Sequence, residues 1–300
     1  MRTMITPYEP QHRAAVVDLL DRSLLAEDAA ESADIVALLA GSAGFVAVDG
    51  DAPDGDVVGV ALASTGRKDP TVGHLDLLAV DPAFRRQGLA RELVGAVEQL
   101  LRARGLSAVR VAGNPPTHAW PGIDVRYTPA VCALTALGYA HDRTAWNMTA
   151  NLAEGSPALR ETRTAQERLA AAHVVVRAAT PDDLTELRPL IAAEWGPAWV
   201  AEVERAVGGS GGCHLAIRDG QPIAFAAWGG CRPSWFGPMG TLPAASGLGI
   251  GGVLLRRCLR EQADRGITRA QIGWVGPVPF YSGAAGAVIE RVFFLFHKPL

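Results

Sequence analysis

The sequence predicts two tandem α/β domains, and three observations support this fold class. The chain has 300 residues, which is long for one domain and suits two of about 150. A segment beginning at Asp81-Pro82-Ala83 recurs at Leu242-Pro243-Ala244 with a constant offset of 161 residues. Around both copies, short apolar runs typical of strands alternate with longer runs of helical periodicity.

The composition excludes several classes of protein. Hydrophobic residues make up 49% of the chain and charged residues 20%, which rules out extensive disorder. No apolar run is long enough to span a membrane, and the N-terminal residues lack the apolar core of a secretion signal. The net charge of −3 does not favour nucleic-acid binding. The four cysteines are widely spaced, so we expect a cytoplasmic protein with neither disulfides nor a metal site.

The elements follow the same order in both halves. In the first half we expect strands near residues 4–6, 45–48, 57–62, 75–80 and 108–112, with helices after Pro10, between Gly88 and Gly105, and from Thr128. In the second half the matching strands lie near residues 174–177, 214–217, 223–228, 236–240 and 270–274. The predicted organisation is a domain at 1–152, a linker at 153–172 and a second domain at 173–300.

The densest signal is the turn from strand to helix in each repeat. In the first copy it reads Arg85-Arg86-Gln87-Gly88-Leu89-Ala90, and in the second Ser246-Gly247-Leu248-Gly249-Ile250-Gly251. The first amides of a helix have no partner within it, and small residues let an anion approach them. The two arginines of the first copy would add charge-assisted hydrogen bonds to a diphosphate.

The turn resembles motif A of the Gcn5-related N-acetyltransferases, Q/R-x-x-G-x-G/A. The second copy departs from this motif, because Ser246 stands where Arg or Gln is usual. With the repeat, the resemblance covers nearly the whole chain, in a tandem layout similar to that of mycothiol synthases. The second copy also fits a dinucleotide fingerprint, but it lies after two hairpin strands instead of in a first β-α-β unit.

The resemblance implies a fold and a ligand. Each domain would have a mixed, mostly antiparallel sheet, flanked by helices, that splays between its fourth and fifth strands. Acyl-CoA, as the co-substrate, would bind in the splay. Its pantetheine would pair with the fourth strand, at Leu78-Ala79-Val80 in one half and Met239-Gly240-Thr241 in the other.

The resemblance also implies a general acid in the second half. Family members often place a tyrosine in the helix after the fifth strand, where its hydroxyl protonates the departing thiolate. Tyr281 matches that position, whereas Leu134 occupies it in the first half. We therefore expect the chemistry in the second half and a degenerate first half.

Other candidate residues are less distinctive. Asp76 and His74 lie on the fourth strand of the first half, where the family often carries a general base. His118 and Asp124 lie in a polar and aromatic loop, and Glu194 lies near the end of a helix. Trp195 and Trp199 are one helical turn apart and could line an acceptor pocket.

Taken together, these features predict an acyl-CoA-dependent N-acetyltransferase that transfers an acyl group to a small-molecule amine by direct attack in a ternary complex. Two alternatives stay open: a non-catalytic acyl-CoA-binding or sensing protein, and an acyltransferase whose donor is held by an acyl carrier protein. We expect no nucleic-acid or membrane partner. We also expect a monomer, because the tandem halves can supply within one chain the contact that single-domain relatives make as dimers.

Overall fold

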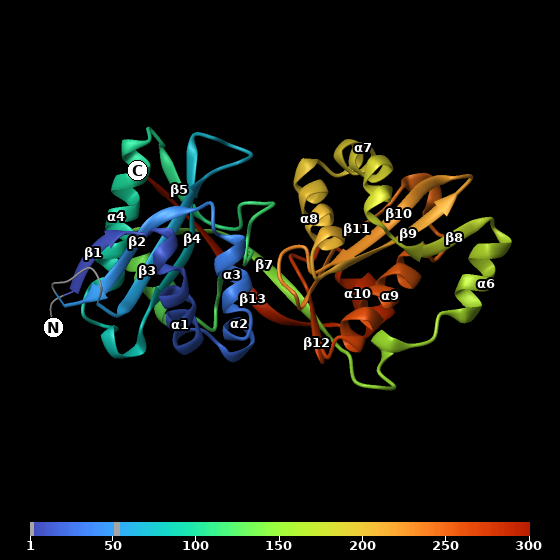
Figure 1. The fold of residues 1–300 in the computed structure, drawn as a ribbon, viewed down its shortest axis with the longest axis horizontal. Coiled ribbons are helices and arrows are strands. Elements are labelled where there is room, and N and C mark those ends of the chain that lie inside the picture. Colours follow the sequence, from blue (N-terminus) through green and yellow to red (C-terminus); the bar gives the residue numbers. More distant parts are fainter. Residues whose placement is uncertain (1–2, 51–54) are drawn as a thin grey trace. The chain divides into compact units, whose positions relative to one another are not determined.

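The computed structural model describes residues 3–50 and 55–300, which form two compact units (Figure 1). Unit 1 comprises Met1–Ala145 and Val292–Leu300, and unit 2 comprises Trp146–Arg291. No described helix is both long and apolar enough to cross a lipid bilayer.

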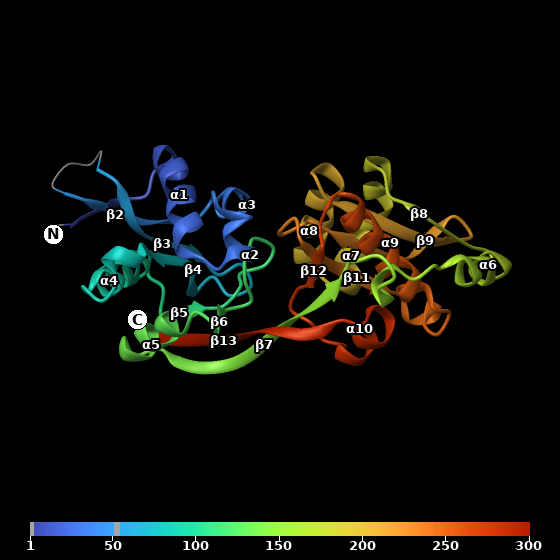
Figure 2. The same cartoon turned by 90° about the horizontal axis from the view of Figure 1, so that it is seen from below.

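Unit 1 is built on a sheet with the strand order β1-β2-β3-β4-β5-β13. Neighbouring strands are antiparallel except β4 and β5, which run parallel. Helices α1 and α3 pack on one face of the sheet and α4 on the other (Figure 2). The elements of the first half are β1 (Thr3–Pro7), η1 (Pro10–His12), α1 (Arg13–Ser23), α2 (Ala26–Ala29), α3 (Ser32–Leu38), β2 (Ala43–Asp49), β3 (Val57–Thr65), β4 (Val72–Val80), η2 (Pro82–Phe84), α4 (Leu89–Ala103), β5 (Ala108–Val111), β6 (Ile123–Asp124), α5 (Thr128–Ala136) and β7 (Ala140–Asn151).

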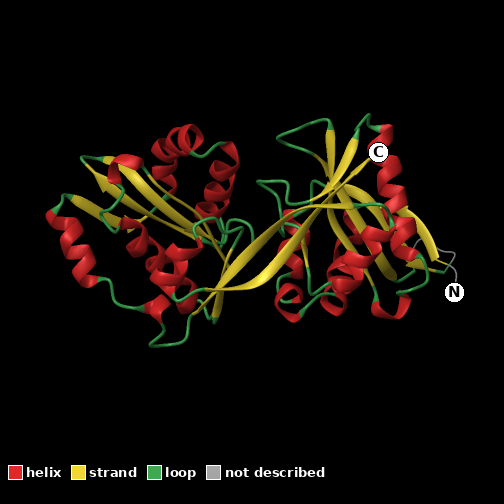
Figure 3. Cartoon of the chain, turned by 180° about the vertical axis from the view of Figure 1, so that it is seen from behind, coloured by secondary structure: helices red, strands yellow, loops and turns green. Residues whose placement is uncertain are grey.

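Unit 2 repeats this plan with the order β7-β12-β11-β10-β9-β8, in which β11 and β12 are the parallel pair. Helices α7 and α8 cover one face of the sheet, and α9 and α10 cover the other (Figure 3). The remaining elements are η3 (Pro157–Leu159), α6 (Arg163–Ala171), β8 (Val174–Ala178), η4 (Pro181–Asp183), α7 (Leu184–Glu194), α8 (Pro197–Gly208), β9 (Gly212–Arg218), β10 (Gln221–Trp228), β11 (Trp235–Thr241), η5 (Pro243–Ala245), α9 (Ile250–Asp264), β12 (Arg269–Ile272), α10 (Val278–Ala285) and β13 (Val288–Pro299).

The two helices after the glycine-containing turns are formed as the repeat predicts. In α4 the buried side chains recur at helical spacing, at Leu89, Leu93, Val94, Val97 and Leu101. The corresponding face of α9 packs into the core of unit 2. The helices end before Gly105 and Gly266, whose φ angles of +78° and +84° suit glycine.

The two halves of the chain exchange their last strands. The second half of β13 pairs with β5 in unit 1, with Phe296 opposite Val111. The second half of β7 pairs with β12 in unit 2, with Ala150 opposite Ala270. The compact units therefore differ from the expected domains 1–152 and 173–300. Local apolar patterns identify a strand but do not identify its partner, so the sequence does not reveal the exchange.

The expected linker at 153–172 is part of unit 2. Ala158 and Leu159 of η3 are buried in its core, together with Leu169 of α6. Arg260 of α9 donates a hydrogen bond to the Leu159 carbonyl, with an N–O distance of 2.6 Å. This segment is therefore an ordered support for α9 and not a spacer between two domains.

Candidate functional site

The sheet of unit 1 opens between β4 and β5. These parallel strands pair only from Val72 to His74, and β4 then continues to Val80 with β3 on one edge. Among the described residues, no strand pairs with the other edge of β4 from Leu75 onward. An extended ligand could therefore hydrogen-bond to this free edge as an added strand would.

The turn after β4 presents main-chain amides at the N-terminus of α4. Gly88 has a φ of +91°, and a Cβ built on it would meet no atom closer than 4.0 Å. Within residues 3–50 and 55–300, the amides from Arg86 to Ala90 have no main-chain acceptor. Unpaired amides and the positive end of the helix dipole together favour an anion such as a diphosphate.

Arg85 has a structural role in this turn. Its Nε donates to the Val80 carbonyl at 3.0 Å, and its Nη2 donates to the Ser23 carbonyl at 3.1 Å. The Gln87 side chain donates to the Ala83 carbonyl at 3.2 Å. Both side chains therefore help to fix the turn that carries these amides.

A cavity of about 1160 Å³ connects the open strand edge with this turn, and all its lining residues belong to unit 1. One wall is β4 from Leu75 to Val80, and the turn at Arg85, Arg86 and Gly88 continues it to Leu89 and Ala90 of α4. The opposite wall comes from α5 and the segment before it, with Asn114, His118, Trp120, Asp124 and Leu134. The cavity brings together Asp76, His118 and Asp124, three of the residues that the sequence singled out.

Asp76 is the titratable residue at the open edge of β4. Leu77 pairs with Leu62 and Leu75 pairs with Ala63, so Asp76 is the extra residue of a β-bulge. Its two carboxylate oxygens accept hydrogen bonds from Ser42 Oγ at 2.7 Å and Ser64 Oγ at 3.0 Å. Burial raises the pKa of Asp76 to about 6, although these hydrogen bonds and Arg67 act in the opposite direction. The group is a base at neutral pH and can take up a proton.

His74 and Asp124 are engaged in other interactions. The Nδ1 atom of His74 lies 2.9 Å from the Ala112 carbonyl, and burial lowers the pKa of its imidazole. Asp124 is almost fully buried, and its carboxylate accepts hydrogen bonds from Arg126 at 2.8 and 3.1 Å. Arg126 also pairs with Glu27 at 2.7 Å. Asp124 is therefore held by a cation on the cavity wall.

The residues at the expected position of a general acid lie near the ends of α5 and α10. Gly138 and Gly286 follow α5 and α10, and the amide after each glycine donates back to the helix. The acceptors are the carbonyls of Leu134, four residues before Gly138, and of Tyr281, five residues before Gly286, so both residues lie in the helix close to the position that the sequence predicts for the acid. Leu134 is fully buried and has no proton to donate.

Unit 2 also has an open edge and a glycine-containing turn. Strands β11 and β12 pair only at Trp235 and Phe236, and β11 continues to Thr241. The amides from Gly247 to Gly251 have no main-chain acceptor within the described part of the chain. Gly249 has a φ of +78°, close to that of Gly88 in unit 1.

Two side chains approach the start of α9 beside this edge in unit 2. A Cβ added to Gly251 would lie 3.3 Å from Phe280 Cζ and 3.4 Å from Met239 Cε, so side chains from both sides of the splay meet there. The corresponding residues of unit 1 are Ala90, Ala133 and Leu78, and all three line the cavity.

The aromatic residues of unit 2 pack within the unit. The rings of Trp195 and Trp199 are stacked with centroids 6.0 Å apart, and both contact Phe225. A Cβ on Gly240 would lie 2.5 Å from Trp195 Cζ2, so Trp195 covers β11. Glu194, at the end of α7, is exposed.

Tyr281 packs beside Phe236 and Phe280, and burial raises the pKa of its phenol to about 12.

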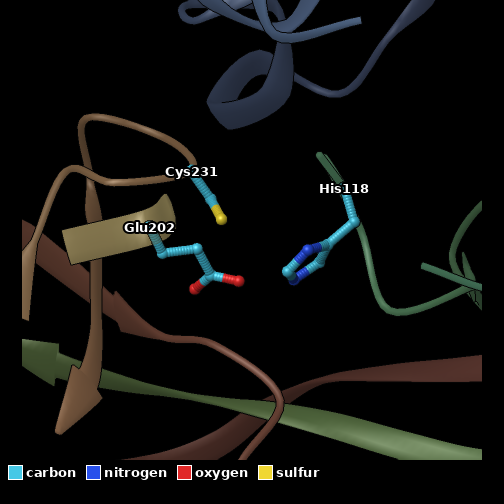
Figure 4. Close-up of side chains that lie close together, drawn as sticks. All are labelled: His118, Glu202 and Cys231. Atoms are coloured by element: carbon cyan, nitrogen blue, oxygen red, sulfur yellow. The ribbon is translucent and has the colours of Figure 1, made fainter. Parts of the chain in front are cut away.

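Glu202 and Cys231 lie side by side in unit 2, and no sequence motif marks them (Figure 4). Burial raises the pKa of Glu202 to about 7 and raises the pKa of the Cys231 thiol. Sequence motifs likewise do not mark Ser42, Ser64 and Asn114, which lie beside Asp76. Isolated serines, asparagines and glutamates carry no motif, so only the folded arrangement identifies them.

Comparison with known proteins agrees with this architecture. Residues 13–120 match the acetyltransferase (GNAT) family. The chain is similar in structure to a tandem GNAT protein from the clavulanic acid biosynthesis pathway, with a TM-score of 0.68, 16% identity and coverage of 99% of this chain and 98% of that one. A GCN5-related N-acetyltransferase from Sphaerobacter thermophilus gives a TM-score of 0.65 at 17% identity, covering 99% and 95%.

A third similar structure is a glucosamine N-acetyltransferase region of a fungal multi-domain β-N-acetylglucosaminidase. Its TM-score is 0.74 at 17% identity and 99% of this chain is covered, but the chain spans only 38% of that protein's length. No curated protein sequence matches the chain. At these identities the likenesses show the fold alone, and this fold has a tandem layout like that of the similar structures.

Proposed function

We propose that this tandem GNAT protein is an acyl-CoA-dependent N-acyltransferase that acts on a small-molecule amine, with acyl-CoA bound in the cavity of unit 1. One observation carries the proposal. A single cavity joins the free edge of β4, the amides without main-chain acceptors at the start of α4 and the half-buried carboxylate of Asp76. These features suit the pantetheine, the diphosphate and the reacting amine, in that order.

Asp76 is the residue of this cavity best suited to act as general base. An amine acceptor arrives as an ammonium ion, and the Asp76 carboxylate would accept one of its protons. The free amine would then attack the thioester carbon, a C–N bond would form, the C–S bond would break, and the nitrogen would release its second proton to solvent. A group with a pKa of about 6 is largely deprotonated at pH 7 and close enough to that pH to exchange protons readily.

This proposal places the donor in unit 1, whereas the sequence favoured chemistry in the second half because of Tyr281. The support for unit 1 is steric. In unit 2, Met239 and Phe280 both approach Gly251, which corresponds to Ala90 on the wall of the cavity in unit 1. Because Leu134 cannot donate a proton, the departing thiolate in unit 1 would take one from solvent.

A specific observation also favours a second function. Unit 1 has the cavity but Leu134 at the expected acid position, and unit 2 has Tyr281 but two side chains that meet over Gly251. A protein that binds acyl-CoA without turning it over would show this division. Thiol release from acetyl-CoA in the presence of an amine panel distinguishes a transferase from such a sensor.

Calorimetry with coenzyme A on paired glycine variants tests the binding site. Gly88→Val should abolish binding in unit 1, because valine is strained at a φ of +91° and its side chain would block the amides. Gly249→Val is the matched control, since it disturbs the equivalent turn of unit 2. If Gly88→Val binds coenzyme A as the wild type does, the assignment of the cavity is wrong.

A further inference from the structure

Asp76 stands at the end of a chain of hydrogen bonds that begins at a main-chain amide. The amide of Arg67 donates to Asn114 Oδ1 at 3.1 Å. Asn114 Nδ2 donates to Ser64 Oγ at 2.9 Å, and Ser64 Oγ lies 3.0 Å from Asp76 Oδ1. The chain therefore links the β3–β4 hairpin, the loop after β5 and the bulge in β4.

The orientation of the Asn114 side chain is fixed by two main-chain groups. The Arg67 N–H can only donate, so the atom facing it must be the amide oxygen. The Thr65 carbonyl can only accept, and it lies 3.0 Å from the other end of the amide, which must be the NH₂ group. A flipped amide would lose both contacts. Asn114 is 3% exposed, so little water is available to replace them.

This fixed amide determines the direction of the Ser64 hydroxyl. Ser64 Oγ accepts a hydrogen bond from Asn114, so its own single proton is available for Asp76. We propose that Asn114 and Ser64 are positioning residues, which hold the Asp76 carboxylate at the open edge of β4 and keep it in the charged form. The inference deepens the proposed function, because its effect on turnover rests on Asp76 acting as the base.

The surroundings of Asp76 contain few competing charges. Arg67 is the charged side chain that acts on the carboxylate, and it favours the charged form. His74 lies two residues away on the same strand, with its Nδ1 directed to the Ala112 carbonyl. The other contacts are neutral hydroxyl groups, from Ser42 before β2 and Ser64 on β3. The two serines therefore supply the hydrogen bonds that oppose the effect of burial.

A matched pair of substitutions at Ser64 tests the proposal. Ser64→Thr keeps the hydroxyl, whereas Ser64→Val has the same shape as threonine but no hydroxyl. The titration of Asp76 is followed by NMR of ¹³C-labelled aspartate in the full chain without ligands, and Asp76→Asn identifies the signal. We expect the midpoint to rise by about one pH unit in Ser64→Val, about tenfold in the protonation equilibrium, and to stay near its wild-type value in Ser64→Thr.

Asn114→Leu should raise the midpoint in the same direction, because the Ser64 hydroxyl is then no longer held by the amide. The acid limb of the pH–rate profile should move with the titration in each variant. An unchanged midpoint in Ser64→Val, or equal rises in Ser64→Val and Ser64→Thr, would overturn the proposal. The titration does not depend on turnover. Failure of the positioning role proposed for Asn114 and Ser64 can therefore be told apart from failure of the proposed acyl transfer.

Discussion

A single carboxylate connects the local structure of unit 1 with its proposed chemistry. The bulge in β4 places Asp76 beside the cavity, where it is removed from most solvent contact. Two serine hydroxyls stabilise its charge without fully offsetting the cost of burial. Such an arrangement gives up stability for reactivity, which is common at active sites.

Asp76→Asn should therefore lower activity and raise stability together. Loss of the base should reduce turnover by roughly 10²- to 10⁴-fold. The rise in pKa from 3.8 to about 6 corresponds to about 3 kcal/mol that the charged form costs the folded state at pH 7. The unfolded chain releases this proton at a lower pH than the folded chain does. The free energy of unfolding of the wild type therefore falls as pH rises from about 4 to 6. The variant, which has no carboxyl group at this position, should lack this fall. Denaturant unfolding at several pH values measures it.

Tyr281→Phe is the control for this prediction. If the chemistry is in unit 1, removal of the phenol should change turnover by less than about threefold, since Tyr281 lies outside the cavity. The reverse pattern, with Tyr281→Phe inactive and Asp76→Asn active, would assign the reaction to unit 2. The rate of wild-type turnover should also fall below about pH 6, as Asp76 becomes protonated.

At the scale of elements, the sequence is informative about the turns and less so about the space beside them. The glycine spacing predicts both helix starts, and α4 and α9 begin at Leu89 and Ile250, directly after Gly88 and Gly249. Whether a splay is open depends on side chains that meet from distant segments. Met239 and Phe280 are 41 residues apart, and no local pattern reports that they meet over Gly251.

A double substitution should open the splay of unit 2. Met239→Ala with Phe280→Ala removes the two side chains over Gly251, beside a turn whose amides have no main-chain acceptor in the described chain. We expect coenzyme A to bind the wild type at one site and the double variant at two, as measured by calorimetry. Ala133→Phe is the converse, because it places a ring in unit 1 where Phe280 stands in unit 2. Binding of coenzyme A at two sites in the wild type would contradict the assignment of the binding site to unit 1 alone.

At the scale of the whole molecule, the repeat in the sequence predicts two similar folds but not which strand completes each. The exchange assigns the last residues of the chain to unit 1. Phe293, Leu295 and Phe296 of β13 are buried there, and Lys298 Nζ lies 2.7 Å from the buried carboxylate of Glu98 in α4. Tyr139 donates to the same carboxylate at 3.1 Å. The C-terminal end therefore supports the sheet that carries the proposed site.

Phe296→Ala should accordingly destabilise unit 1, although residue 296 follows unit 2 in the sequence. Removal of a buried phenylalanine costs about 3–5 kcal/mol, and the loss should appear as faster hydrogen exchange in β4 and β5. Ile289→Ala is the matched control, because Ile289 lies on the same strand within unit 2 and is 47% exposed. Its effect on the free energy of unfolding should stay within about 0.5 kcal/mol.

Faster exchange confined to β11 and β12 in Phe296→Ala would show that β13 completes unit 2 instead. Because the free edge of β4 depends on where β5 is held, Phe296→Ala should also weaken coenzyme A binding.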